Sequence, residues 1–325
     1  MIDTMAVARS ETLLGYFKRT WRQNIIYIGF IVVFLFFAVT LHDKGFLTPN
    51  NILNIARQTA MIAVMAVAMT LVLSSGEIDL SVGAVAGLAS VTTAMAVAWG
   101  GVPAGIAAGV MTGVAVGLIN GFLSTRLMIP TFLTTLAMMG IAKGTAMWIS
   151  DTAAIPVLDP TYPAIFGGGI GPIPTLLVWM LVVGVIGHIV LRRTKFGRQI
   201  LAVGGNVVAA RYSGINTGRI KLWVIVISAV TASLAGMLYA GRLQTGRFQL
   251  GEGDELSVIA AVVLGGTSLF GGKGTVVGSI IGALMIGVIN NGLILMGLEY
   301  SQQLIARGGI IILAVALSQA GTRTA

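Results

Sequence analysis

Long apolar runs recur along nearly the whole chain, and they constrain its fold more than any other feature. An α-helix rises about 1.5 Å per residue, so about 20 apolar residues cross the roughly 30 Å of hydrocarbon in a bilayer. Only 10% of the 325 residues are charged, whereas soluble domains use about 25% to cover their surface. The two-residue alternation of membrane barrels does not occur. The sequence therefore predicts an all-α polytopic membrane protein.

We expect about ten transmembrane helices. The first run, 25–41, follows three basic residues and precedes no small-residue cleavage site, so we interpret it as an uncleaved span. This interpretation gives an N-terminal cytoplasmic segment 1–23, one transmembrane domain 24–318 and a cytoplasmic tail 319–325. The predicted spans are residues 25–41, 58–75, 80–98, 102–123, 129–149, 175–191, 222–241, 255–271, 275–297 and 303–318.

Basic residues gather on one side of the predicted bilayer. With the N-terminus in the cytoplasm, the connection 192–221 also lies there, and it is the most basic segment of the chain. Cytoplasmic loops of membrane proteins are enriched in Lys and Arg, so we expect both termini in the cytoplasm. The same rule accounts for the net charge of +9, and we expect no nucleic-acid partner.

Two short motifs each occur twice, in the same order. Asp79–Val82 (Asp-Leu-Ser-Val) is echoed by Glu255–Val258, and Gly117–Gly121 is echoed by Gly287–Asn291. Each pair falls on predicted spans that run in opposite directions. This arrangement predicts an inverted repeat, a recurring construction of transporters.

Glycine recurs at every fourth position in the span 102–123, and a shorter series opens the span 275–297. Glycine at this spacing leaves a groove in which another helix can approach closely. We therefore expect tight helix packing here rather than a glycine-lined pore. The residues are Gly101, Gly105, Gly109, Gly113, Gly117 and Gly121, followed by Gly274, Gly278 and Gly282.

A few polar residues lie in or beside the spans. The acids Asp79 and Glu255 open predicted helices, where the helix dipole favours a carboxylate, so capping is their first role and gating the second. Interhelical hydrogen bonds explain the asparagines better than substrate contact does. Lys143 can extend to the membrane surface or line a path. The candidates for the translocation path or a gate are Asp79, Asn120, Lys143, Glu255, Asn290 and Asn291.

The chain has no constellation typical of catalysis. It contains no Walker loop, no cysteine, and no spacing that pairs a nucleophile with a base. We therefore expect neither an enzyme nor a bound cofactor or metal. An ion-coupled secondary transporter of a small polar solute is the alternative, although it needs a carboxylate at membrane depth and every acid falls near a predicted span end.

The segment 197–218 is the most informative part of the basic connection. Asn206 is placed to cap a short helix through Ala209 and Ala210, which Gly214 would end. Two alanines on a short helix form a low surface that fits a groove of another protein. The alternative is a basic loop against anionic lipid headgroups.

The residues of this segment resemble the cytoplasmic coupling segment of permease subunits in ribose-type sugar ABC importers. Gly76–Gly83 resembles the same family's signature near its third span, and so do Leu256–Ser268 and Asn290–Gly292. The likeness covers about 45–318. Two positions depart from the pattern, because Val208 replaces an acidic residue and Glu77 replaces a common glycine. The coupling residues that the resemblance implies are Gly205, Asn206, Ala209, Ala210, Ser213, Gly214 and Ile215.

The resemblance implies a vitamin B12-importer-like (type II) permease fold in a bacterial inner membrane. It also implies a dimer of permeases, two ATPase subunits that bind ATP and Mg, and a periplasmic sugar-binding protein. ATP binding and hydrolysis in the partner would move the coupling segment and expose a central path to each side in turn. The carried sugar or polyol is left open.

Overall fold

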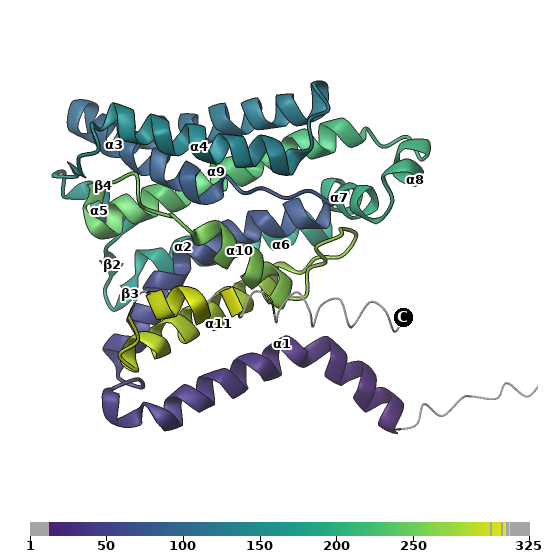
Figure 1. Ribbon diagram of the computed structural model, residues 1–325, viewed down its shortest axis with the longest axis horizontal. Coiled ribbons are helices and arrows are strands. Elements are labelled where there is room, and N and C mark those ends of the chain that lie inside the picture. The colour runs from purple at the N-terminus through teal and green to yellow at the C-terminus, as the bar shows by residue number, and fades with distance from the viewer. Residues whose placement is uncertain (1–12, 300, 307, 310–311, 313–325) are drawn as a thin grey trace, which may run out of the picture.

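The chain is a bundle of helices, most of which lie roughly along one common direction (Figure 1). The computed structural model describes residues 13–299, 301–306, 308–309 and 312, with side chains from residue 26 on. The helices are α1 (Leu13–Thr40), α2 (Pro49–Ser74), α3 (Val82–Arg126), α4 (Thr131–Ile149), α5 (Thr161–Phe166), α6 (Thr175–Arg193), α7 (Lys195–Gly205), α8 (Val207–Tyr212), α9 (Thr217–Leu243), α10 (Asp254–Leu264) and α11 (Val276–Leu295), with a short 3-10 turn, η1 (His42–Lys44).

Six of these helices are long and apolar enough to cross a membrane: α2, α3, α4, α6, α9 and α11. Helix α1 adds a shorter apolar stretch, Ile26–Thr40. The prediction of a polytopic helical membrane protein is confirmed. The predicted count of ten stays a prediction, because its last span, 303–318, falls mostly outside the described residues.

Helix α3 is a hairpin of two arms. Its backbone leaves helical geometry at Gly100 and Gly101, and Gly101 has a φ of 72°, a conformation that glycine adopts without strain. The arms then run back along each other, since the Oγ1 atoms of Thr92 and Thr112 lie 2.9 Å apart. The two predicted spans 80–98 and 102–123 correspond to these arms.

Helix α10 corrects the predicted span 255–271. It has 11 residues and ends at Leu264, so it extends about 16 Å at 1.5 Å per residue, half of the hydrocarbon thickness. The following residues, 265–275, form turns that lead into α11. No charged residue follows Glu255 until Lys273, which explains why the sequence predicts a full span. The backbone ends the helix at Gly265 and Gly266, and the φ of Gly266 is 87°.

The bundle has two distinct ends. The α7–α8 end lies on the right in Figure 1, and the α5 end, with the four short strands, lies on the left. Strand β1 (Ile155–Pro156) pairs with β4 (Thr245–Gly246), and β2 (Gly169–Ile170) pairs with β3 (Ile173–Pro174), both antiparallel. Each pair ties part of the proline-rich loop 150–174 into place.

Helix α5 closes that loop over the bundle. The buried Tyr162 hydroxyl donates a hydrogen bond to the carbonyl of Met237, 3.0 Å away. Burial raises the pKa of the Tyr162 phenol above its ordinary value, so it remains a neutral donor. Phe166 stacks on Tyr162 and on Trp179, with ring centroids 4.8 and 5.5 Å apart. These contacts fix the loop to α6 and α9.

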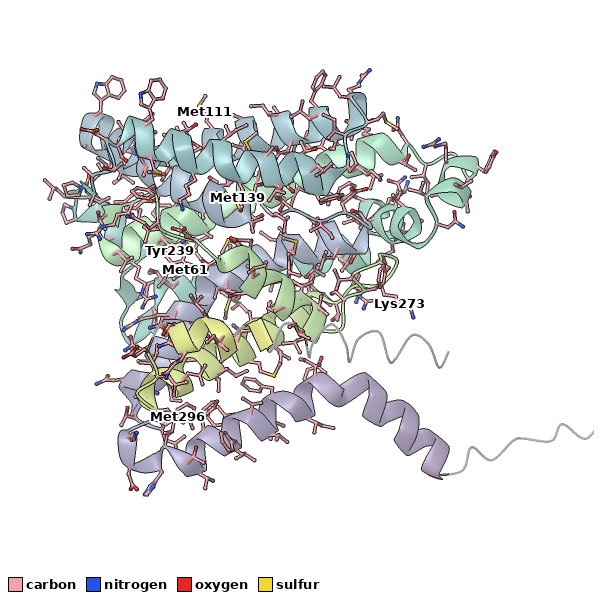
Figure 2. All side chains as sticks on the ribbon, in the orientation of Figure 1. Met61, Met111, Met139, Tyr239, Lys273 and Met296 are labelled. Atoms are coloured by element: carbon pink, nitrogen blue, oxygen red, sulfur yellow. The ribbon has the colours of Figure 1, made fainter. Side chains whose placement is uncertain are left out.

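The glycine series of α3 packs tightly, as predicted, and its main helix neighbour is α9. A Cβ added at Gly113 would lie 2.7 Å from the Cα of Val230, and one added at Gly117 would lie 2.7 Å from the Cα of Val226. Only glycine permits two helices to approach this closely. Figure 2 shows the contrast between inside and outside: Met61 on α2 is fully buried, whereas Met111 on the outer side of α3 is 69% exposed.

Candidate functional site

Two short helices form the α7–α8 end. Asn206 ends α7 and caps α8, because its side-chain oxygen accepts hydrogen bonds from the amides of Val208 and Ala209, both at 3.0 Å. Helix α8 then ends at a turn in which Gly214 has a φ of 82°. The predicted helix, its asparagine cap and its terminating glycine are all present, which is local chemistry that a sequence can reveal.

The outer surface of α8 differs in one respect from the expected pair of alanines. Ala209 is exposed, but Ala210 is buried against the bundle, 5% exposed. The exposed surface is formed instead by Val208, Ala209, Arg211, Tyr212 and Ser213, and Tyr212 is 89% exposed. A helix has a periodicity of 3.6 residues, so neighbouring alanines cannot both occupy the centre of one face.

Helix α7 lies against two segments from distant parts of the chain. A Cβ added at Gly204 would lie 1.9 Å from the carbonyl oxygen of Ser74 and 2.7 Å from the amide nitrogen of Gly272. Ser74 ends α2, and the Gly272 amide donates a hydrogen bond to its carbonyl at 3.0 Å. Three backbones therefore meet at Gly204 with no room for a side chain.

The segments that contain Ser74 and Gly272 each adjoin a helix that begins inside the bundle: α3 after Ser74, and α10 before Gly272. After α2, the non-helical segment 75–81 runs back into the protein and leads to α3. On the opposite side, the segment 244–253 runs inward along the first arm of α3, where the Ser90 hydroxyl donates a hydrogen bond to the Arg247 carbonyl at 3.0 Å. It leads to α10, which ends in the turns that contain Gly272.

The beginnings of α3 and α10 meet in the interior. A Cβ at Gly83 would lie 2.2 Å from the carbonyl oxygen of Gly251 and 2.5 Å from a carboxylate oxygen of Glu255. From this point the first arm of α3 runs toward the α5 end and α10 runs toward the α7–α8 end (Figure 1). The echoed motifs Asp79–Val82 and Glu255–Val258 lie at these two starts. Interrupted helices at corresponding positions of two repeats typically surround a transporter's central site.

A buried polar cluster supports the start of α3. Asp79 is fully buried, and its Oδ1 accepts hydrogen bonds from the Ser81 amide at 2.9 Å and the Ser81 hydroxyl at 2.6 Å. Asn120, on the second arm of α3, donates to the Ser81 hydroxyl at 3.4 Å. The expected interhelical role of Asn120 is thus observed. Asp79 lies just before the start of α3, as expected, and it is buried because segment 75–81 turns inward.

An ion pair links each non-helical segment to a neighbouring helix. Glu77 pairs with Lys221 on α9 near the α7–α8 end, and both side chains are largely shielded. Glu252 pairs with Lys143 on α4 at 2.6 Å, where both are more exposed. Lys143 therefore contacts an acid of another segment rather than extending alone to the surface. No local pattern reveals these pairs, since each joins residues more than a hundred positions apart.

The other candidates lie in separate places. Asn291 on α11 and Asn51 on α2 exchange two hydrogen bonds, at 2.8 and 3.0 Å. Asn290, the neighbouring residue, is half-buried on another side of α11. The structure therefore brings Asp79, Asn120 and Glu255 to the region where α3 and α10 begin, and Lys143 contacts its edge through Glu252. Asn290 and Asn291 lie outside it.

Within the described part of the chain, no three His, Asp or Glu side chains gather where they could hold a metal ion. The arrangement is instead an exposed short helix, α8, joined through α7 to the segments that adjoin α3 and α10.

Comparison with known proteins identifies the family. Residues 51–315 match the family described as "Branched-chain amino acid transport system / permease component". The chain belongs to this permease family. It is 42% identical to the ribose import permease protein RbsC of Bacillus subtilis over 294 residues, covering 89% of this chain and 90% of the relative. It is 38% identical to RbsC of Escherichia coli K12 over 316 residues, covering 94% and 97%.

A third relative is the L-arabinose ABC transporter permease protein AraH of Azospirillum brasilense, 36% identical over 316 residues, with coverage of 97% and 92%. These matches confirm the resemblance to ribose-type sugar permeases that the sequence motifs indicate. The apolar helices and the family together describe this permease as a multi-pass inner-membrane protein. Sequence reasoning missed Gly204, Glu77–Lys221 and the inward course of segments 75–81 and 244–253.

Proposed function

We propose that this permease is the membrane subunit of an ATP-driven importer that carries a monosaccharide or a related polyol. The relatives that support this class are named for ribose and L-arabinose. A periplasmic binding protein would deliver the sugar, and a separate ATPase subunit would bind ATP and Mg. The chain itself would perform no catalysis.

The contact at Gly204 carries the proposal. A coupling segment must transmit movement to the helices that open and close the path, and α7 touches two segments that adjoin interrupted helices. Docking of the ATPase on the exposed residues of α8 would displace α7. Because the backbones of Ser74, Gly204 and Gly272 are in direct contact, segments 75–81 and 265–275 would move with it. The starts of α3 and α10 would then separate or close, which is alternating access.

Charge placement supports the orientation of the chain in this proposal. The α7–α8 end carries the basic connection 192–221 together with Arg126 and Lys273. Basic residues favour the cytoplasmic side, so this end would face the ATPase. The α5 end would then face the periplasm, where loop 150–174 and segment 244–253 offer a docking surface for the binding protein. Both termini would be cytoplasmic.

A second copy of the permease would complete the path. Helix α4 has an exposed side on which Gly140 and Gly144 have no neighbouring atom within 4 Å of an added Cβ. This is the same four-residue glycine spacing that packs α3 closely against α9. The chain contains no cysteine, so a single Gly140→Cys variant would form an inter-subunit disulfide if two α4 helices meet. Absence of that disulfide under oxidation would exclude this face from the dimer contact.

Reconstitution tests the function directly. The permease and a partner ATPase subunit are reconstituted in proteoliposomes, with ATP and the ATPase on one side of the membrane and the binding protein and sugar on the other. We expect sugar uptake that requires all three proteins and ATP and that persists when protonophores and sodium ionophores collapse the ion gradients. Uptake that needs an ion gradient and no ATPase would refute the proposal.

The burial of Asp79 favours one alternative, an ion-coupled secondary transporter. A carboxylate enclosed at this depth is typical of proton or sodium sites in such transporters. The ionophore arm of the reconstitution separates the two functions. An Asp79→Asn variant that retains ATP-driven uptake would further exclude a role for this carboxylate in ion coupling.

A further inference from the structure

A hollow beside α9 at the α7–α8 end is unexplained by the proposed transport mechanism. It consists of two adjoining cavities of about 530 and 540 Å³ that share Asn216, Arg219 and Trp223. The first is also lined by side chains of α7, and the second by the end of α3. The remaining lining residues are Phe196, Gln199, Gly214, Ile220 and Ile227 in the first, and Thr125, Arg126, Gly218 and Leu222 in the second.

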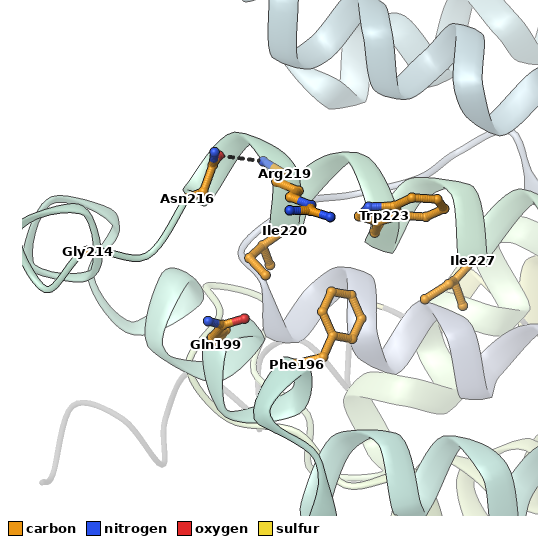
Figure 3. A pocket seen from close by; sticks show the side chains of 8 residues that line it. All are labelled: Phe196, Gln199, Gly214, Asn216, Arg219, Ile220, Trp223 and Ile227. Carbon is orange, nitrogen blue, oxygen red and sulfur yellow. Dashed lines mark hydrogen bonds between the residues drawn. The ribbon is translucent and has the colours of Figure 1, made fainter.

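The hollow changes from polar to apolar along α9 (Figure 3). Asn216 and Arg219 lie at its outer end, Trp223 follows one turn deeper, and Ile227 lies one further turn into the bundle. The distance from Arg219 to Ile227 along the helix is about 12 Å at 1.5 Å per residue. Phe196 closes the apolar part from the α7 side. The order is cation, indole, then hydrocarbon, which is the order of groups at a membrane surface.

The hollow carries unneutralised positive charge. Among the described residues, neither Arg219 nor Arg126 belongs to an ion pair, and Glu77, the acid at this end of the bundle, pairs with Lys221 instead. Figure 3 shows the Arg219 side chain extending toward Trp223. Trp223 is 44% exposed, so its ring is accessible from the hollow.

We propose that this hollow binds one anionic phospholipid, with the headgroup phosphate between Arg126 and Arg219 and an acyl chain along Trp223 and Ile227. A soluble anion would satisfy the arginines but would leave the apolar wall empty. A zwitterionic lipid would fill the apolar wall but carries a cation that the arginines repel. Basic pockets between helices at a membrane surface recognise anionic headgroups for this reason.

The bound lipid would hold the two sides of the hollow together. Arg126 ends α3, Arg219 begins α9, and Phe196 belongs to α7. One headgroup would therefore join the arm of α3 to the helix that follows α8. Lipid composition would influence the position of α7 without contact with sugar or ATP.

Quenching of tryptophan fluorescence by brominated acyl chains tests the proposal on the purified, delipidated permease in detergent micelles. The Trp223 signal is the difference between the wild type and Trp223→Phe. We expect brominated phosphatidylglycerol to quench it at a lower mole fraction than brominated phosphatidylcholine. Arg219→Gln should raise the phosphatidylglycerol requirement about fivefold, and adding Arg126→Gln about thirtyfold in total, at the usual contribution of one basic residue to lipid attraction.

Two control variants separate the pocket from general charge. Arg193→Gln removes an exposed cation of α6 that does not line the hollow, and it should leave quenching unchanged. Arg219→Lys keeps the charge and should retain the preference for phosphatidylglycerol. Equal quenching by both lipids, or equal effects of Arg193→Gln and Arg219→Gln, would overturn the proposal.

Two further experiments test whether a soluble anion or the ATPase subunit occupies the hollow instead of a lipid. Glycerol 3-phosphate that restores the fluorescence at millimolar concentration would show a soluble-anion site and overturn the lipid assignment. Purified ATPase subunit that displaces brominated phosphatidylglycerol from Trp223 would show that the hollow belongs to the protein interface, which would also overturn it. Retention of the lipid in both arms supports the proposal.

Discussion

Replacement of Gly204 by alanine adds one methyl group at the contact through which α7 is proposed to move the segments next to α3 and α10. The new methyl would lie 1.9 Å from the Ser74 carbonyl oxygen and 2.7 Å from the Gly272 amide nitrogen. Both neighbours are backbone atoms, so they cannot rotate away, and restoring an ordinary contact of roughly 3.4 Å requires a displacement of about 1.5 Å. Overpacking of this kind typically costs about 1–3 kcal/mol.

Gly205→Ala provides a matched control one residue away. A Cβ there would lie 3.9 Å from the Cα of Gly272, an ordinary contact, and Gly205 has no positive φ. Alanine favours a helix over glycine by up to about 1 kcal/mol. We therefore expect Gly205→Ala to be as stable as the wild type or slightly more so, whereas Gly204→Ala loses up to about 2 kcal/mol after a helix preference of about 1 kcal/mol is subtracted.

Two assays measure the consequences. Thermal unfolding of the purified permease should show a lower midpoint for Gly204→Ala and no loss for Gly205→Ala. In the reconstituted importer, strain of about 1–2 kcal/mol confined to this conformation shifts its equilibrium with the opposite one by about five- to thirtyfold, since 1.4 kcal/mol is tenfold. Sugar-stimulated ATPase activity should change accordingly in Gly204→Ala, and Gly205→Ala, which lies in the coupling segment, serves as the control for stability. Indistinguishable stability and activity of the two variants would refute the reasoning.

Three other predictions concern single contacts. Asn206→Ala removes the cap that accepts two amides of α8, so affinity for the ATPase should fall by the equivalent of about 1 kcal/mol, while Asn206→Asp retains it; equal affinities of both variants, measured by titration calorimetry, would contradict the capping role. Asp79→Asn keeps an acceptor for Ser81 and should unfold near the wild-type temperature, whereas Asp79→Ala leaves the buried Ser81 amide unpaired and should cost about 1–3 kcal/mol; equal destabilisation of both variants would show that the charge itself is needed. For the shielded pair Glu77–Lys221, a double-mutant cycle on unfolding should give a larger coupling energy than the same cycle on the exposed pair Lys143–Glu252, for which less than about 1 kcal/mol is expected; equal coupling energies would count against this.

The features of the site that the sequence alone predicts are those that depend on residues close together in the chain. The asparagine cap and the glycine end of α8 involve residues a few positions apart, and the side chains that make them are the ones those positions require. The glycine series of α3 predicts a close helix neighbour, although it does not say that the neighbour is α9. Hydropathy places the long helices because the bilayer imposes one length on all of them.

The length of α10 and the depth of Asp79 are set differently. For residues 255–271 the sequence predicts a full crossing of the membrane. For Asp79 it shows only that the residue lies next to the end of a predicted span. Segments 75–81 and 244–253 instead run into the bundle, because side chains of α3 and α4 satisfy backbone groups there: Ser90 on α3 bonds to the backbone of Arg247, and Thr135 on α4 accepts the amide of Leu80 at 3.1 Å. Non-helical backbone is tolerated at membrane depth only where protein surrounds it.

The sequence by itself determined that this chain is a helical membrane permease and that an asparagine-capped helix forms at its basic end. These properties follow from composition and from contacts between near neighbours in the chain. Only the tertiary structure decided that α10 is a half-length helix, that Asp79 is buried, that Gly204 joins Ser74 to Gly272, and that Arg126 and Arg219 share a hollow. Each of these depends on residues brought together from distant positions, and their separation in space is set by the packing of whole helices.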